Sequence, residues 1–386
     1  MKKGILAAVL AGTMALGLSC AAMADDTIRI GFFAPESAPA AAADGQSSRQ
    51  SADMAVKMIN DAGGINGAKV ELVAYDDGLD TKEAANIGEK LTTSDDVVAV
   101  VSGSYSGPTK VVAPICQDAG MLLISAYAVH PDVINAGDLI FSQSFPQSVQ
   151  GTAAAEFAAN TLGAKKVAII AVDLDFGTEQ ANYFKAQAEK YGMEIVSEDY
   201  LAISDNDLTS VITKIKGEDV DLIYSANYYE QAAEVCRQAA LQGLDCAILG
   251  TEGADSWQLL QTAGEYANGL YITTNMNRDD QNETTQAYID AYREEYDMEP
   301  DMVGASVYDA FQVLFTAIEN AGTDAEAMKD YIAGMKDFDT VTGKLLYYNA
   351  NGSAVKPVQV QQVVDGNYHF AATIDDESII DPANFE

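Results

Sequence analysis

The stretch that decides the fold runs from Val98 to Pro114 and reads VAVVSGSYSGPTKVVAP. It begins with an unbroken apolar run, which predicts a strand buried on both faces of a parallel sheet. Serine, glycine and tyrosine follow, and Pro108 then opens a pattern with helical spacing. A buried strand that leads through small polar residues into a helix is typical of an anion-binding site at the helix N-terminus.

The chain around this stretch alternates between apolar runs and amphipathic segments. In the first part, the sequence predicts strands over 28–34, 70–77, 97–103 and 121–127, with helices over 81–94 and 107–119. The strands are continuously apolar and do not alternate, so we expect a parallel sheet with helices on both faces. The fold class is therefore α/β.

A second set of the same kind begins after residue 148. The predicted helices are 149–162, 178–191, 207–217 and 229–242, and the predicted strands are 166–173, 194–201, 221–228, 247–252 and 269–275. Three further helices, over 283–296, 302–321 and 325–335, precede a strand-rich tail that starts at 343. Because crossover connections between parallel strands are right-handed, we expect these three helices to pack on the first sheet.

Two doubly wound parallel-sheet domains follow from this order of elements. We expect a signal peptide over 1–24, an N-terminal lobe over 27–145 plus 277–353, and a C-terminal lobe over 146–276 plus 354–386. Three short crossings, near 143–148, 273–277 and 353–357, would form a hinge between the lobes. A ligand cleft is then expected between them, beyond the carboxyl ends of the strands.

The N-terminus has the features of an export signal. Lys2 and Lys3 precede an apolar run from Ile5 to Leu18, and Ala22-Met23-Ala24 provides a small-residue cleavage site. We therefore expect a periplasmic protein, cleaved after Ala24. Lipid attachment at Cys20 is the alternative, because a lipid-attachment box also ends in a cysteine after small residues, but Gly17 and Leu18 depart from that box.

The composition excludes several classes of function. The formal net charge is −36, whereas nucleic-acid binding requires a basic surface. No later stretch approaches the roughly 20 apolar residues of a membrane-spanning helix, so we expect a soluble mature chain. We also expect this chain to be a monomer. With two histidines and no CxxC spacing, the sequence predicts no metal and no cofactor. Whether Cys236 and Cys246 form a disulfide stays open.

Ser106 and Gly107 are the sharpest site candidates. Serine favours a helix cap and proline the first turn, so the first N–H groups after Ser106 should face the cleft and attract a carboxylate. The alternative is an ordinary cap that bonds only its own backbone. A serine-hydrolase elbow is excluded, because GSYSG places Tyr105 where G-x-S-x-G requires the nucleophile. We therefore expect no enzyme activity.

Glu252 is the second anchor candidate. It follows a buried strand in LGTEGADS and could accept hydrogen bonds from a ligand ammonium. Capping a helix that starts near residue 254 is the alternative. Tyr228 also follows a strand, and its ring could face a ligand or only fill space between the domains.

Several motifs together carry a family resemblance. They are INDAGGING followed by KVELVAYDDGLD, then AVVSGSYSG, APICQDAGMLLISAYAVHP, ANYYEQAAEVCRQAALQGL and GTEGA. On these residues the chain from Ile28 to about Val364 resembles the periplasmic leucine/isoleucine/valine-binding family of ABC-transporter substrate-binding proteins. The resemblance implies a hinged two-domain fold that captures a small molecule without transforming it, and an ABC permease in the inner membrane as partner.

The resemblance also implies roles for individual residues. Ser106 matches the serine that holds the ligand α-carboxylate, and Glu252 matches the acid that receives the α-ammonium. Tyr228 matches a cleft tyrosine, and Phe176 takes the place of another aromatic residue. An amino acid or similar small carboxylate is thus the expected ligand.

The chain departs from the family at three places. Tyr127-Ala128-Val129 replaces a small-small-Thr stretch, and Asp44 stands where a tryptophan wall often lies. Neither Leu79 nor Tyr105 is a cysteine, so a disulfide found in part of the family is absent. If Asp44 faces the cleft, it would favour a second cation on the ligand. An aromatic acid or amide as ligand, and a signalling partner in place of a permease, are the alternatives.

Overall fold

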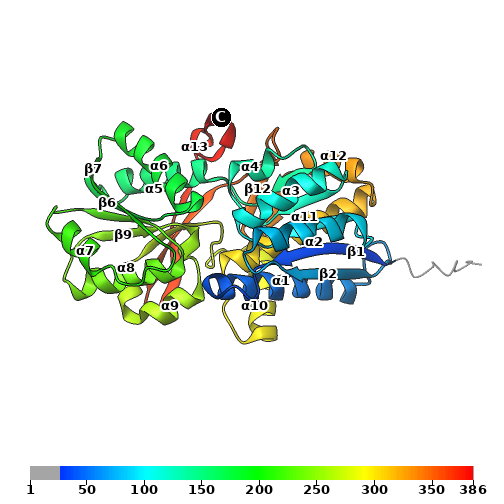
Figure 1. The fold of residues 1–386 in the computed structure, drawn as a ribbon, viewed down its shortest axis with the longest axis horizontal. Helices are drawn as coiled ribbons and strands as arrows, with labels where there is room; N and C mark the ends of the chain where they lie inside the picture. Colours follow the sequence, from blue (N-terminus) through cyan, green and yellow to red (C-terminus); the bar gives the residue numbers. More distant parts are fainter. Residues whose placement is uncertain (1–26, 386) are drawn as a thin grey trace, which may run out of the picture.

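The structure, a computed structural model, describes residues 27–385. The predicted signal peptide and Cys20 lie outside the described residues. Two lobes lie side by side along the long axis of the molecule (Figure 1). Strands β1 (Ile28–Ala34) and β2 (Val70–Asp76) lie in one lobe, and β6 (Lys166–Val172) and β7 (Glu194–Leu201) lie in the other. The predicted α/β fold with two domains is confirmed.

The sheet of the first lobe contains five parallel strands in the order β2-β1-β3-β4-β5. Their bounds are β1 Ile28–Ala34, β2 Val70–Asp76, β3 Ala99–Ser102, β4 Leu122–Ser125 and β5 Ile140–Ser142. Alternate residues point to opposite faces of the sheet. Phe32 and Val101 pack with helices α1 (Ala42–Asp61) and α11 (Met302–Ala321), whereas Phe33 packs with α2 (Thr81–Thr93) and α3 (Ser106–Asp118). Because helices cover both faces of the sheet, the sequence of each interior strand is a continuous apolar run.

The remaining helices of the first lobe come from two distant parts of the chain. Those from the first part are α2 Thr81–Thr93, α3 Ser106–Asp118 and the short α4 Pro131–Ile134. Those from the later part are α10 Glu283–Tyr296 and α12 Ala325–Ala333, which share the core of α11 and the first sheet. A small antiparallel sheet, β11 (Lys336–Thr340), β12 (Gly343–Tyr348) and β13 (Ala354–Val355), joins the same lobe.

The sheet of the second lobe has seven strands, in the order β15-β14-β10-β9-β8-β6-β7. Their bounds are β6 Lys166–Val172, β7 Glu194–Leu201, β8 Leu222–Ala226, β9 Ala247–Gly250, β10 Tyr271–Thr274, β14 Val358–Val364 and β15 Asn367–Ile374. Five of them match the predicted parallel strands, and the tail adds β14 and β15 in antiparallel orientation. A tail that ends in the second lobe requires a third crossing.

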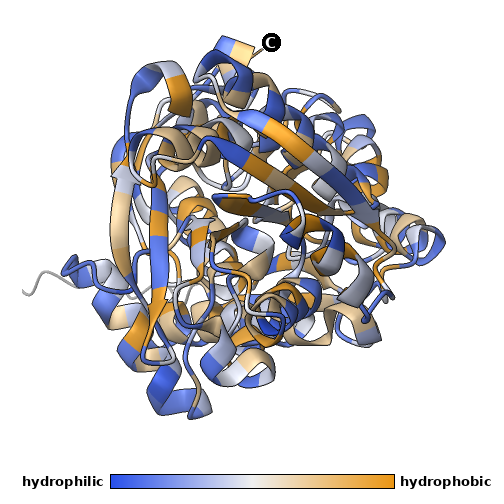
Figure 2. Ribbon diagram, turned by 90° about the vertical axis from the view of Figure 1, so that its left-hand side faces the viewer, coloured by the Kyte–Doolittle hydropathy of each residue, from blue (hydrophilic) through white to orange (hydrophobic). Residues whose placement is uncertain are grey.

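Five helices surround this second sheet, and their bounds follow the amphipathic pattern of the sequence. They are α5 Gln147–Asn160, α6 Asp175–Lys190, α7 Thr209–Lys216, α8 Tyr229–Leu241 and α9 Trp257–Ala263, and the short α13 Glu377–Ile380 follows the tail. Figure 2 views this lobe end-on and shows helices that carry both hydrophilic and hydrophobic residues. The division of the chain into the two predicted sets of segments stays a prediction, which these packing contacts support.

The crossings lie against one another between the lobes. Asn275, after β10, donates a hydrogen bond from Nδ2 to Ser144 Oγ in the first crossing, at 2.5 Å. Tyr348 donates to the side-chain oxygen of Gln143 at 2.7 Å, which ties the first crossing to β12. All these side chains are buried. The first crossing is therefore hydrogen-bonded both to the second crossing and to β12.

A buried charge pair anchors the third crossing. Lys356, between β13 and β14, is 0% exposed, and its ammonium donates to the hydroxyl of Thr342. Thr342 and the backbone N–H of Val341 in turn donate to the carboxylate of Asp309 on α11. Burial lowers the pKa of Lys356 to about 8, and the nearby charge of Asp309 opposes that shift. The ammonium and the carboxylate thus share one hydroxyl inside the hinge.

The described cysteines are free thiols, so the open question of a Cys236–Cys246 disulfide is answered in the negative. Cys236 packs in the core beneath α8 and α9, whereas Cys246 packs against a different hydrophobic cluster. Within residues 27–385, no helix is both long and apolar enough to cross a bilayer. The same residues contain no group of His, Cys, Asp and Glu side chains suited to a metal ion.

Candidate functional site

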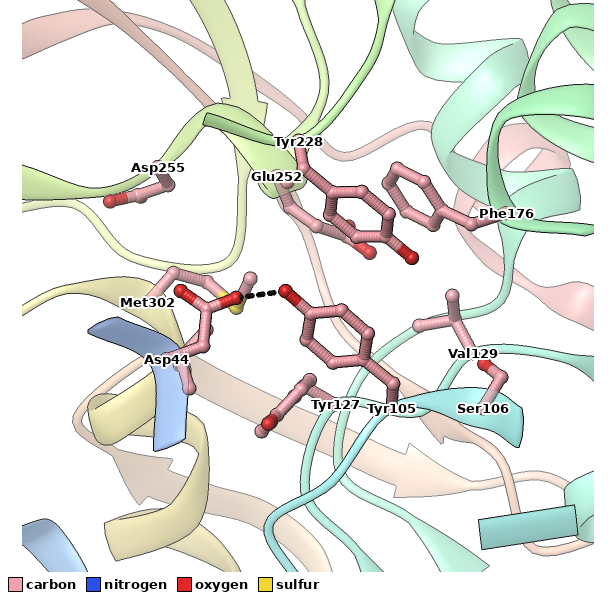
Figure 3. Close-up of a pocket in the computed structure, with 12 residues that line it drawn as sticks. Asp44, Tyr105, Ser106, Tyr127, Val129, Phe176, Tyr228, Glu252, Asp255 and Met302 are labelled. Carbon is pink, nitrogen blue, oxygen red and sulfur yellow. Dashed lines mark hydrogen bonds between the residues drawn. The ribbon is translucent and has the colours of Figure 1, made fainter. Parts of the chain in front are cut away.

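A cavity lies where the two lobes meet, at the carboxyl ends of the strands. It is bordered by both lobes, and the side chains of the two lobes nearly fill it (Figure 3). The residues that line it are Asp44, Tyr105, Ser106, Tyr127, Val129, Met302 and Val303 of the first lobe, and Phe176, Tyr228, Glu252, Gly253 and Asp255 of the second. Eight of the ten residues predicted for the site are in this set.

Ser106 borders the cavity at the start of α3, but it does not cap the helix. The capping position belongs to Tyr105, whose backbone is extended, and Ser106 is the first helical residue. The Ser106 hydroxyl accepts a hydrogen bond from the His130 N–H at 3.3 Å. The expectation of a serine cap is therefore wrong, because the turn begins one residue earlier. The first N–H groups of α3 still lack partners within the helix.

Glu252 is a buried carboxyl at the opposite wall of the cavity. It begins a short 3-10 turn after β9 and is 4% exposed. It does not cap the following helix, since the side chain of Ser256 accepts from Gln258 N–H there. Glu252 Oε2 has no hydrogen-bond partner among the described residues. Burial raises the pKa of Glu252 to about 8, against the opposing effect of a hydrogen bond from Gln150.

Three aromatic rings form a stack that crosses the cavity from one lobe to the other. The Tyr228 ring lies between Phe176 and Tyr105, with centroids 4.8 Å and 4.9 Å away and nearly parallel planes. Tyr127 meets Tyr105 edge to plane, with a centroid distance of 6.2 Å. Stacking of this kind stabilises the contact by more than the burial of apolar surface alone would. The lobes are thus closed on one another through their aromatic side chains.

Asp44 faces the cavity from the N-terminal part of α1. The Tyr105 hydroxyl donates to Asp44 Oδ2 at 2.6 Å, and this hydrogen bond is drawn in Figure 3. Burial, followed by repulsion from Asp301, raises the pKa of Asp44 to about 7. Asp301 caps α11 and accepts from Gly304 N–H, yet its Oδ2 has no partner among the described residues. A pair of buried acids therefore occupies this end of the site.

Two of the predicted site residues lie outside the cavity. Gly107 borders a wider groove at the mouth of the cleft, which Ser106 also lines. Ala128 turns into the core between the first sheet and helices α2 and α3. Its neighbours Tyr127 and Val129 line the cavity, and the Tyr127 hydroxyl donates to the Gly103 carbonyl at 2.7 Å. The alternation of side chains along an extended segment explains why Ala128 alone points away.

Four lining residues were missed from the sequence: Gly253, Asp255, Met302 and Val303. Gly253 lies in the quoted GTEGA motif, and a Cβ there would come within 2.9 Å of the Asn227 carbonyl oxygen and 3.1 Å of the Phe176 ring. The absence of a side chain at Gly253 thus lets Phe176 approach the backbone. Met302 and Val303 begin α11, and only the tertiary packing brings them to the cavity.

Asp255 is buried, and Arg278 compensates its charge. The Arg278 guanidinium contacts both carboxylate oxygens and also donates to Gln361 Oε1 at 2.6 Å. Its plane lies over the Tyr368 ring, 4.7 Å from the centroid. Further donation to the Pro300 carbonyl connects the guanidinium to the first lobe. Asp255 is therefore the one cavity acid with a cationic partner among the described residues.

The edges of the cleft carry contacts of a different kind. At one edge, Lys110 of α3 pairs with Asp175 of α6 at 2.7 Å, and His130 Nε2 lies 3.6 Å from the same carboxylate. At another edge, Trp257 of the second lobe lines a groove whose opposite wall comes from the first lobe. The residues of that opposite wall are Arg293, Glu299 and Pro300.

Two hinged α/β lobes that close over a buried, polar and aromatic cavity define a class of ligand-binding proteins. The sequence model of the periplasmic binding protein family matches residues 27–367. The chain therefore belongs to the periplasmic binding protein family. Membership in this family makes it a solute-binding protein and not an enzyme, and the resemblance found in the sequence is confirmed.

Relatives of known specificity share most of the chain. The leucine-, isoleucine-, valine-, threonine- and alanine-binding protein of Pseudomonas aeruginosa is 31% identical, over 89% of this chain and 92% of its own length. The LivJ substrate-binding protein of a branched-chain amino acid transporter from Streptococcus pneumoniae, solved with isoleucine, is 32% identical with a TM-score of 0.83, over 90% of this chain and 99% of its own.

A more distantly related protein has a similar fold and was solved with a ligand of another class. A solute-binding protein of an ABC transporter from Rhodopseudomonas palustris, solved with 3,4-dihydroxybenzoic acid, has a TM-score of 0.83 at 20% identity. The likeness covers 94% of this chain and all of that one. At this identity the comparison shows the shared fold alone.

Proposed function

We propose that this chain is the extracytoplasmic receptor of an ABC importer and that it captures an amino acid between its lobes. The observation that carries the proposal is Glu252, a buried carboxyl with a free oxygen, which lines the same cavity as the start of α3. Buried polar groups normally have partners, so a ligand ammonium is the natural complement of this carboxyl.

The opposite end of the zwitterion fits Ser106. The N-terminus of α3 carries a partial positive charge, and the Ser106 hydroxyl can donate to a carboxylate. Closure of the lobes would bring both anchors onto one ligand and shift the hinge equilibrium toward the closed form. The Pseudomonas aeruginosa relative is named for binding amino acids, and LivJ was solved with isoleucine, so an amino acid is the ligand class that both the site and these two comparisons favour.

The proposal includes a place and a partner. After removal of residues 1–24, the chain would work in the periplasm and deliver its ligand, as a monomer, to an ABC permease in the inner membrane. Delivery to a signalling protein is the competing role. Neighbouring genes separate these roles, because a permease and an ATPase accompany a transport receptor whereas a kinase accompanies a sensor.

The direct test is a thermal-shift screen of the protein after removal of bound ligand by unfolding and refolding. An amino acid with micromolar affinity, at millimolar concentration, should stabilise the folded protein by about 4 kcal/mol. Benzoate and 4-hydroxybenzoate are the matched probes that lack the ammonium. Stabilisation by these acids and by no amino acid would contradict the proposal.

Replacement of Asp175 by asparagine tests the closure contact at the cleft edge. The change removes the ion pair with Lys110, and we expect a loss of affinity of at most about fivefold, since solvent-exposed pairs contribute up to about 1 kcal/mol. The effect should shrink at high salt. Isothermal titration with the most stabilising amino acid of the screen measures it.

Glu198→Gln is the matched control for this contact. It breaks the pair between Lys185 and Glu198, which has the same 2.7 Å separation but lies within the second lobe. The affinity of this variant should equal that of the unaltered protein. Equal losses in both variants would show that the effect of Asp175 does not come from lobe closure.

A further inference from the structure

The charges that surround the cavity do not balance. Three carboxyls, those of Asp44, Glu252 and Asp255, line it, and Asp301 lies directly before the lining residue Met302. Arg278 is the buried cation recorded beside them in the described structure, and it pairs with Asp255. One ligand ammonium at Glu252 would still leave Asp44 without a cation, whereas the charge of Arg278 acts on both Asp255 and Asp301.

Leaving Asp44 without a cation, beside a second buried acid, is costly. Asp44 is 5% and Asp301 is 1% exposed, so water reaches their side chains poorly. An isolated buried carboxylate is unfavourable unless it is paired or takes up a proton. The pKa of Asp301, raised to about 6 mainly by burial, and that of Asp44, raised to about 7, show this cost. A positively charged group beside Asp44 would remove this free-energy cost.

Asp44 and Ser106 lie at opposite sides of the cavity. In Figure 3 the Tyr105 ring separates the Asp44 carboxylate from the Ser106 hydroxyl, and Glu252 lies above the ring. A ligand whose carboxylate is held at Ser106 and whose ammonium is held at Glu252 would thus extend its side chain toward Asp44. The far end of that side chain is the part that Asp44 contacts.

The wall between the two ends fits an alkyl chain that carries a terminal cation. Tyr105, Tyr127 and Met302 supply aromatic and thioether surface along this part of the cavity. Methylene groups pack well on such surfaces, and a cation beside an aromatic ring gains further attraction. The relatives with aliphatic ligands do not require a carboxylate at this end, because a branched alkyl side chain has no charge to pair.

We propose that Asp44 selects a ligand with a second positively charged nitrogen, that is, an amino acid whose side chain ends in an ammonium or guanidinium group. The proposal rests on the proposed amino-acid receptor function and adds the class of side chain. Asp44 receives the side-chain cation, Asp301 strengthens the negative potential behind it, and the Tyr105 hydroxyl orients the carboxylate through its hydrogen bond.

A series of matched ligands tests this selectivity on the unaltered protein. Isothermal titration would compare lysine and ornithine with norleucine, and arginine with citrulline, which has a similar shape but no charge. We expect the cationic member of each pair to bind at least about tenfold more tightly, as a charge-assisted hydrogen bond provides. The preference should persist at high salt, since the site is buried.

Two variants connect the preference to one carboxylate. Asp44→Asn should remove the preference for lysine over norleucine, with norleucine binding unchanged or stronger. Tyr105→Phe removes the hydrogen bond but keeps the charge of Asp44, so the preference for the cation should remain. Asp95→Asn is the matched control, because Asp95 accepts from the Tyr75 hydroxyl at 2.8 Å on the surface of the first lobe.

The outcomes separate this inference from the receptor function. If leucine or norleucine binds with full dependence on Glu252 and no cationic amino acid binds better, the receptor function holds and the role of Asp44 is refuted. If no amino acid binds at all, the amino-acid receptor function is refuted, and the proposed role of Asp44 is refuted with it. A preference for lysine that survives Asp44→Asn also refutes the assignment to Asp44.

Discussion

Glu252→Gln is expected to weaken amino-acid binding by more than about a hundredfold while the protein still folds. The substitution keeps the shape of the side chain but removes the charge that would hold the α-ammonium. Truncating one partner of a buried charge pair commonly costs about 2 to 5 kcal/mol of binding free energy. Isothermal titration, with the most stabilising amino acid of the thermal screen, measures the loss directly.

Folding should not suffer, because burial already disfavours the charged form of Glu252. The melting temperature of ligand-free Glu252→Gln protein should therefore equal or exceed that of the unaltered chain at pH 8. Glu230→Gln is the control: it lies two residues beyond Tyr228, in the exposed first turn of α8. Unchanged affinity in Glu252→Gln would refute the ammonium site.

The same carboxyls predict how pH acts. The pKa values of Glu252 and Asp44, about 8 and about 7, lie above their ordinary values of 4.5 and 3.8. The folded ligand-free protein holds these protons more tightly than the unfolded chain, so the stabilisation present below about pH 4 is lost as pH rises through 7 and 8. The groups that face these two carboxyls are Tyr105, Gln150, Asp255 and Asp301.

A bound ammonium reverses this preference, because it favours the charged carboxylate. Binding should then release protons, and the affinity should rise from pH 6 to pH 8. Titrations at one pH in two buffers with different heats of ionisation count the protons. In Glu252→Gln protein the released number should fall.

Lys356→Met is expected to destabilise the protein by about 3 to 5 kcal/mol. The change leaves Asp309 buried on α11 without the ammonium that shares the Thr342 hydroxyl with it. Breaking a buried pair from one side costs this much, because the remaining charge is uncompensated. The midpoint of guanidinium unfolding, followed by circular dichroism, reports the loss.

The double variant Lys356→Met with Asp309→Asn is the matched comparison. If the two charges depend on each other, this variant should be more stable than the sum of the single losses predicts, by about 0.5 to 3 kcal/mol. Strict additivity would show that Lys356 acts through packing alone. The pair would then have no electrostatic role in the hinge.

Much of the fold could be predicted from the sequence because its strands are buried on both faces. The predicted and observed bounds agree fully for β1, β7, α10 and α11. The tail was harder to predict. β11 begins at Lys336, before the strand-rich region expected from residue 343, and its charged residues give no apolar pattern.

The site was predictable where it follows strand ends, and less so elsewhere. Ser106, Phe176, Tyr228 and Glu252 all come directly after buried strands, and the parallel topology brings them to one edge. Met302 and Val303 reach the cavity only through the packing of α11 on the first sheet, which local sequence does not encode. The cap at Ser106 was misplaced because serine preference alone cannot fix a helix start to within one residue.

The groove beside Trp257 has a practical consequence. The chain contains a single tryptophan, and its indole lies where residues of the first and second lobes face each other. When the lobes separate, water replaces the facing residues around this ring, and the colour and intensity of its emission should change. The protein thus carries an intrinsic optical probe, and ligand capture could be followed in real time on unlabelled material.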